Sequence, residues 1–110
     1  MNAHVVRRRD SRQFMLGQED CREYVKTEKV TFGTSTLLPQ QEGDIDHGHP
    51  NSQEVFFVSQ GRVIVRLGSQ GEKLEMQEGD ALLVPENVAH QVSNIGNTPA
   101  IIVWSLSPSE

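Results

Sequence analysis

The chain has 110 residues and a mass of 12.3 kDa, which leaves room for a single domain. Its composition, 35% hydrophobic and 23% charged with a mean hydropathy of −0.47, is that of a folded water-soluble protein. No apolar run approaches the roughly 20 residues that cross a bilayer, and the first residues lack the apolar stretch of a signal peptide. We therefore expect a cytoplasmic protein that makes no membrane contact.

The charge disfavours a nucleic-acid-binding protein, and the cysteine content excludes a domain held together by an internal disulfide. Fifteen acidic and ten basic side chains give a formal net charge of −5, which disfavours nucleic-acid binding because that binding is driven largely by phosphate contacts from basic side chains. The cluster Arg7, Arg8, Arg9 and Arg12 has no interleaved aromatic residue, so a solvated arm or a subunit contact is favoured over an RNA-binding tail. Cys21 is the only cysteine, which rules out an internal disulfide; we interpret it as a packing residue, with a reactive thiol left open.

The first 23 residues are polar and show no clear period. We interpret residues 1–23 as an N-terminal arm that is part of the same domain or makes a dimer contact, and residues 24–110 as the folded barrel. From Tyr24 onward, short apolar or β-branched segments alternate with turn residues. The expected strands include Thr34–Leu38, Glu54–Ser59, Arg62–Leu67, Glu72–Met76, Ala81–Val84, His90–Asn94 and Ala100–Ser105. About eight short strands without a convincing helix predict an all-β sandwich or barrel.

Three of the four histidines lie in this β region, and two of them form His47-Gly48-His49. In an extended segment, residues i and i+2 point to the same face, so this spacing directs two imidazoles at one volume. Glu54 opens the next strand after a turn, and His90 begins a later one. Three imidazoles and a carboxylate suit a divalent first-row ion such as Mn, Fe, Co, Ni, Cu or Zn. The alternative is a chance surface pair of histidines beside an ordinary strand-end charge.

Two spaced patterns resemble the two motifs of the cupin family. They are Gly43-x3-His47-x-His49-x4-Glu54-x6-Gly61 and Gly79-x5-Pro85-x-Asn87-x2-His90-x3-Asn94. The chain departs from the family in leaving three rather than five residues between Gly43 and His47, and in having Asn87 where glycine is usual. The resemblance implies a double-stranded β-helix, or jelly-roll barrel, with the site in its mouth. It also implies that His47, His49, Glu54 and His90 bind a divalent metal ion, and that the chain forms a homodimer.

The residues that would select a substrate are harder to identify. Strand alternation puts Phe56 and Val58 on the face of Glu54, so these two, with Gln53 and Gln60, are candidate pocket lining; ordinary barrel core is the alternative for the two apolar residues. Trp104 is interpreted as a core or dimer-interface anchor. The favoured function is a metal-dependent enzyme acting on a small polar molecule, with a dioxygenase ranked before an isomerase, lyase or decarboxylase. A non-enzymatic ligand-binding or sensor cupin is the alternative.

Overall fold

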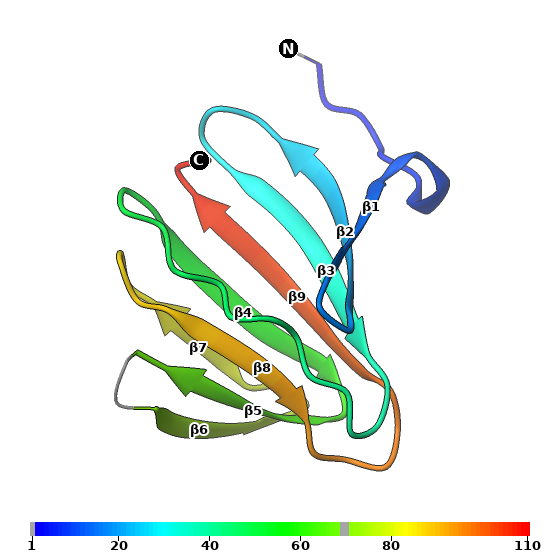
Figure 1. Ribbon diagram of the computed structural model, residues 1–110. Helices are drawn as coiled ribbons and strands as arrows, with labels where there is room; N and C mark the ends of the chain where they lie inside the picture. Colours follow the sequence, from blue (N-terminus) through cyan, green and yellow to red (C-terminus); the bar gives the residue numbers. More distant parts are fainter. Residues whose placement is uncertain (1, 69–70) are drawn as a thin grey trace.

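The computed structural model describes residues 2–68 and 71–110. A 3-10 turn, η1 (Arg8–Asp10), precedes a series of strands. The strands are β1 (Arg12–Leu16), β2 (Glu19–Lys26), β3 (Thr31–Leu37), β4 (Gln53–Gln60), β5 (Arg62–Leu67), β6 (Glu72–Gln77), β7 (Ala81–Val84), β8 (His90–Asn94) and β9 (Ala100–Ser107) (Figure 1). Within these described residues, no helix is long and apolar enough to cross a membrane.

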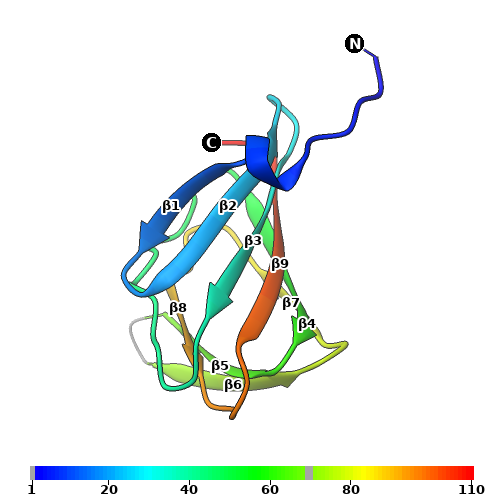
Figure 2. The same ribbon diagram turned by 90° about the vertical axis from the view of Figure 1, so that its right-hand side faces the viewer.

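The strands form two antiparallel sheets that face each other (Figures 1 and 2). The larger sheet has the order β1-β2-β3-β9-β4-β7, and the smaller one has the order β6-β5-β8. Strands distant in sequence are neighbours: β9 lies between β3 and β4, with Thr34 opposite Val103 and Phe56 opposite Trp104. The predicted all-β class is confirmed, and the strands expected over 62–67, 81–84 and 90–94 have the expected bounds.

The core fills the space between the sheets and follows the alternation of the strands. On β4, Phe56 and Val58 point inward and are 6% and 0% exposed, while Val55 and Phe57 point outward and are each 42% exposed. Val63 and Val65 supply the facing side chains from β5. Burying each such side chain contributes about 1.5–3 kcal/mol, so these alternating positions carry much of the stability.

The larger sheet begins at Arg12, inside the segment that the sequence assigned to an N-terminal arm. All of β1 pairs with residues 19–23 of β2, and the expected boundary at Tyr24 falls within β2. The inward positions of β2 at Glu19 and Cys21 line a cavity rather than the apolar core, so the strand lacks the apolar alternation by which it could have been recognised. Arg7, Arg8 and Arg9 are exposed ahead of β1.

Candidate metal centre

A cavity of about 240 Å³ lies between the two sheets, beside the connection from β3 to β4. Side chains from β1, β2, β3, β8 and β9 line it, together with the start of β4. Its volume falls below the roughly 300–1,000 Å³ of sites for drug-sized ligands, which favours a small ligand.

Backbone pairing holds two polar residues at the wall of this cavity. His90 is the first residue of β8, and it exchanges two backbone hydrogen bonds of 2.8 Å with Asp46. This isolated bridge fixes the connection between β3 and β4 against β8, so that the Asp46 side chain lies beside the His90 ring. Glu54 occupies an inward position of β4, next to the site rather than deep in the core.

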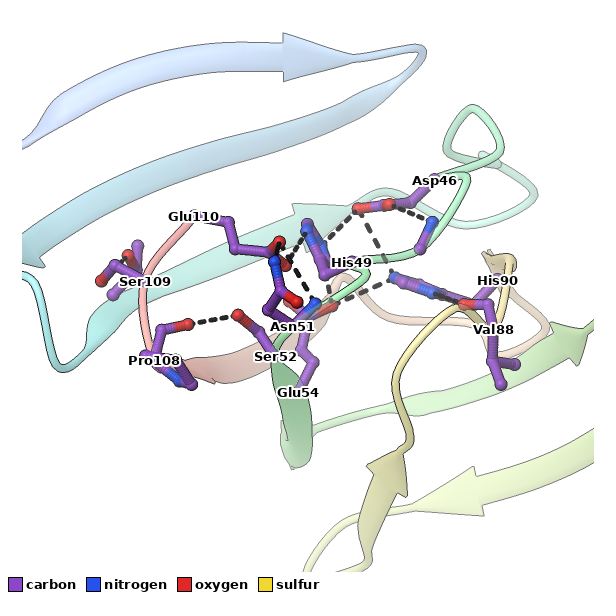
Figure 3. Close-up of polar contacts among 12 residues, drawn as sticks. Asp46, His49, Asn51, Ser52, Glu54, Val88, His90, Pro108, Ser109 and Glu110 are labelled. Atoms are coloured by element: carbon purple, nitrogen blue, oxygen red, sulfur yellow. Dashed lines mark hydrogen bonds and ion pairs between the residues drawn. The ribbon is translucent and has the colours of Figure 1, made fainter.

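Two carboxylates and two imidazoles converge at this point, and Figure 3 shows them pointing toward one another. His90 Nε2 lies 3.1 Å from Glu54 Oε1 and 3.5 Å from Asp46 Oδ2. His49 Nε2 lies 3.4 Å from Asp46 Oδ2 and 3.8 Å from Glu54 Oε1. One ligand atom from each of Asp46, His49 and Glu54 can be chosen so that all three lie within 4.8 Å of one another. Such a group can hold a single cation.

Burial and hydrogen bonding set the electrostatics of the His90–Glu54 contact. His90 Nδ1 lies 3.0 Å from the Val88 carbonyl oxygen, which can only accept, so Nδ1 carries the proton and donates it. Burial alone lowers the pKa of His90, but the contact with the Glu54 carboxylate, the Val88 hydrogen bond and the charge of Asp46 together raise it above its ordinary value. The side chains of His90 and Glu54 are only 4% and 10% exposed. Glu54 Oε1 is buried without a hydrogen-bond partner among the residues described.

His47 does not join this group. Its side chain is exposed and does not line the cavity. The expectation that His47 and His49 share a face assumed an extended segment, but Gly48 between them has a φ of +94°, which breaks the alternation. Gly48 also packs closely on the next motif: a Cβ there would lie 2.9 Å from the Val88 nitrogen. The structure brings Asp46 to the cavity on this segment instead.

The other residues expected to line the pocket divide between the cavity and the core. Phe56 lines the cavity and packs edge-on against His90, with ring centroids 5.4 Å apart. Val58 is fully buried in the core, Gln53 is exposed, and the Gln60 side chain donates to the Pro99 carbonyl at 2.8 Å. Trp104, interpreted as an anchor, lies at the cavity wall.

Three acidic residues at the cavity could not be recognised as site residues from the sequence. Asp46 adjoins the histidine pair, but its place depends on the bridge to His90, which no spacing reveals. Glu110 lies far along the chain from His49, and its Oε2 is 3.7 Å from His49 Nδ1 (Figure 3). Glu19 shares the inward face of β2 with Cys21; a buried strand position occupied by a carboxyl group is recognisable only once the strand itself is known.

Comparison with known proteins identifies the class. A family model described as a cupin domain matches residues 33–106, so the chain belongs to the cupin family. A solved Klebsiella pneumoniae protein with a double-stranded β-helix domain superimposes with a TM-score of 0.81 at 20% identity, covering 97% of this chain and 91% of that one. A predicted oxalate decarboxylase from Thermotoga maritima gives 0.79 at 17% identity, over 96% and 100%. The fold is therefore the expected double-stranded β-helix.

Two curated proteins are related in sequence. The uncharacterized protein MJ1618 of Methanocaldococcus jannaschii is 34% identical over 79 residues, covering 72% of this chain and 55% of its own length. The tetracenomycin polyketide synthase protein TcmJ of Streptomyces glaucescens is 33% identical over 71 residues, covering 64% of this chain and 46% of its own. The chain thus spans about half the length of these relatives.

Proposed function

We propose that the cavity binds a divalent first-row transition metal through His49, Glu54 and His90, with a fourth ligand from Asp46 or His47. The observation that carries this proposal is the 3.1 Å contact between Glu54 Oε1 and His90 Nε2. Two groups that both accept hydrogen bonds can approach this closely only with a proton or a cation shared between them, and the raised pKa of His90 reflects the favourable proton. A metal ion would take the place of that proton, with the lone pair of His90 Nε2 and the buried Glu54 oxygen as ligands.

The donor set fits such an ion. Imidazole nitrogens with carboxylate oxygens suit Mn, Fe, Co, Ni, Cu and Zn. The Val88 carbonyl orients the His90 ring from behind, as outer hydrogen bonds commonly do for histidine ligands. Phe56 packs on the same ring and restricts its rotation.

Two residues compete for the fourth position. Asp46 Oδ2 already lies within 3.5 Å of both His49 Nε2 and His90 Nε2, while its Oδ1 accepts from the Gly48 backbone nitrogen at 3.0 Å. The resemblance to the cupin motif assigns the position to His47, whose exposed side chain would have to turn inward. Comparing Asp46→Asn with His47→Ala separates the two, because only the variant that removes the ligand loses metal affinity.

The proposed activity is that of a metal-dependent enzyme acting on a small polar molecule, with dioxygenation ranked first and isomerase, lyase or decarboxylase reactions next. A bound ion supplies Lewis acidity or, if it is redox-active, a site for O₂. Among this chain's own residues, Phe56 and Trp104 exclude water from part of the cavity wall, and the carboxyl group of Glu19 offers a hydrogen-bonding site. The similarity to a polyketide synthase protein, TcmJ, and to a predicted oxalate decarboxylase supports an enzymatic function for the site.

Metal uptake is the first test. After dialysis against Mn, Fe, Ni or Zn, the wild-type protein is expected to retain close to one ion per chain by elemental analysis. His90→Ala and Glu54→Gln should lower the affinity by at least about tenfold, as loss of one ligand would. His4→Ala, which removes an exposed histidine outside the motifs, is the matched control and should retain the ion. Full retention by both site variants would refute the proposal.

Turnover is the second test. The metal-loaded protein is assayed for O₂ consumption and for conversion of a panel of diols, keto acids and sugars, with the His90→Ala protein as the blank. Conversion of any of these compounds only in the presence of the metal ion would support the enzyme hypothesis. Stoichiometric metal binding without any turnover would instead support the non-enzymatic ligand-binding or sensor cupin.

We also propose that the chain forms a homodimer through the outer face of β4 and its neighbours. Val55 and Phe57 point outward from β4, and Leu83 pairs with Val55 from the edge strand β7. These three side chains are 42%, 42% and 53% exposed, although the inward side of β4 is already apolar. A strand with apolar residues on both faces is typical of burial on both sides, and a second copy of the chain would supply the missing cover.

A further inference from the structure

A carboxyl group outside the proposed ligand set lies in the same cavity. Glu19 begins β2 and is only 8% exposed. It packs against Gly43, where a Cβ would collide with Glu19 Oε1, so glycine at that position makes room for the carboxyl group. Its Oε2 lies 3.7 Å from the Cys21 thiol, which is a weak donor, and it forms no ion pair within residues 2–68 and 71–110. Glu19 therefore keeps hydrogen-bonding capacity for a ligand.

The charge of the cavity wall limits what that ligand can be. Lys26 is the one lysine or arginine among the described lining residues, and it is exposed at the rim. The acidic lining residues are Glu19, Glu23, Asp44, Asp46, Glu54 and Glu110. A divalent ion offsets only part of this negative charge. A ligand carrying two carboxylates would bring further negative charge into a partly buried acidic site, where Coulomb repulsion is weakly screened.

The apolar residues of the cavity wall favour a ligand whose carbon skeleton is apolar. Phe14, Phe56, Trp104 and Leu106 line the cavity from three different strands. Trp104 is held in place by its indole nitrogen, which donates to Ser35 Oγ at 3.0 Å, and Ser35 Oγ lies 3.3 Å from the Cys21 sulfur. An aromatic ring with its polar nitrogen already satisfied thus lines the same cavity as Glu19.

We propose that the cavity takes a small uncharged molecule with hydroxyl groups on an apolar frame, such as a vicinal diol, and that Glu19 binds one of those hydroxyls as a specificity-determining residue. The proposal rests on the proposed function in treating this cavity as the ligand site. Burial raises the pKa of Glu19 above its ordinary value, and the Ser35 and Cys21 hydrogen bonds and the opposing charge of His90 offset this only in part. A carboxyl group in that state can accept from a hydroxyl when ionised and donate to one when protonated.

The test uses Trp104 as a built-in reporter, because it is the only tryptophan of the chain and lines the cavity. The zinc-loaded protein is titrated with trans-1,2-cyclohexanediol and, separately, with trans-1,2-cyclohexanedicarboxylate, and tryptophan fluorescence is followed. The two probes share a ring and differ in charge. The wild type is expected to bind the diol at least about tenfold more tightly than the dicarboxylate. Equal or tighter binding of the dicarboxylate, or no saturable response to the diol, overturns the proposal.

Two matched variants test the role of Glu19 itself. Glu19→Leu is expected to weaken diol binding by about tenfold, the effect of losing one hydrogen bond to a charged group. Asp20→Leu removes a carboxyl group from the same strand at a residue that does not line the cavity and whose Oδ1 accepts from Gln13 Nε2 at 2.9 Å, and it should leave diol binding within about twofold. Unchanged diol affinity in Glu19→Leu overturns the assignment. If that variant does not fold, the wild-type comparison of the two probes still decides the ligand class.

Zinc content is measured on every sample, and each titration is repeated with a chelator. A protein that takes up no zinc refutes the proposed metal centre, while diol selectivity in the chelated sample would still support a ligand site at Glu19. A protein that binds zinc but shows no preference for the diol refutes this inference and leaves the metal centre standing.

Discussion

At the scale of single residues, the cavity carries groups that cost stability rather than supply it. Glu19 is the clearest case, because its carboxyl group is withdrawn from water, forms no ion pair among the residues described, and is offset only in part by the charge of His90. Cys21 beside it is also buried, at 3% exposure. Natural proteins retain such groups where function requires them, often at the expense of folding free energy.

Replacing Glu19 by glutamine is expected to raise the stability of the metal-free protein at neutral pH. The pKa of Glu19 is raised in the folded state, so the folded state retains a proton that the unfolded chain releases above the ordinary carboxyl value of 4.5. This contribution is present at acidic pH and is lost as the pH rises through the folded pKa. The melting temperature of Glu19→Gln should therefore exceed that of the wild type by an amount that grows from about pH 4 to about pH 8. A difference that stays constant with pH would contradict this.

Cys21 is expected to react very slowly with thiol reagents in the folded protein. Burial, and then the nearby Glu19 carboxylate, raise the pKa of the thiol to about 12. At about pH 8 only about one thiol in 10⁴ is then ionised, and reaction with an aromatic disulfide reagent should be roughly a thousandfold slower than for free cysteine. The denatured protein serves as the control and should react at the ordinary rate. Fast labelling of the native protein would restore the reactive-thiol interpretation.

At the scale of elements, the two motifs meet at the Asp46–His90 bridge and at a close backbone approach that requires a glycine. Gly48 has a positive φ and lies against the backbone of Val88, just before β8. This contact joins the connection between β3 and β4 to the segment that carries His90. The position of the histidines relative to each other therefore depends on a backbone approach that a side chain at residue 48 would block.

Gly48→Ala is expected to destabilise the protein by about 1–3 kcal/mol and to weaken metal binding by about tenfold or more, because it combines unfavourable φ with a 2.9 Å clash to backbone. Gly79→Ala is the matched control: its φ is +89°, but a Cβ there would have nothing within 4 Å. The control should lose stability from backbone strain alone and keep its metal. Denaturant unfolding and elemental analysis measure the two effects. Equal metal loss in both variants would show that backbone strain at a positive φ, and not the close approach of residue 48 to Val88, weakens metal binding.

Most strands could be predicted from the sequence, but the first two, β1 and β2, could not. Val63 and Val65 face one core and recur at every second position, so their period alone identifies β5. Glu19 and Cys21 face a cavity instead, and their residue types do not differ from those of an exposed segment. The spacing of His47 and His49 predicted a shared face, but the backbone at Gly48 is not extended and the His47 side chain is exposed.

At the scale of the whole molecule, the proposed homodimer makes a direct prediction. Sedimentation at micromolar concentration should give a mass near twice 12.3 kDa. Phe57→Lys places a charge in the outward apolar face of β4 and should shift the protein to monomer, since burying an unpaired charge is unfavourable. Met15→Lys is the control, because Met15 is 56% exposed on β1, at the opposite edge of the same sheet from β7. A wild-type mass near that of one chain would refute the dimer.

The amino-acid sequence by itself determined the all-β class, the family and three of the residues at the centre, because strand period and motif spacing are local properties that survive without coordinates. Only the tertiary structure decided which polar groups share the cavity. Asp46 reaches it through a bridge to His90, Glu19 through the pairing of β2 in the larger sheet, and Glu110 from the far end of the chain. These approaches join segments that lie far apart in sequence, and such long-range contacts leave no periodic trace in a single chain.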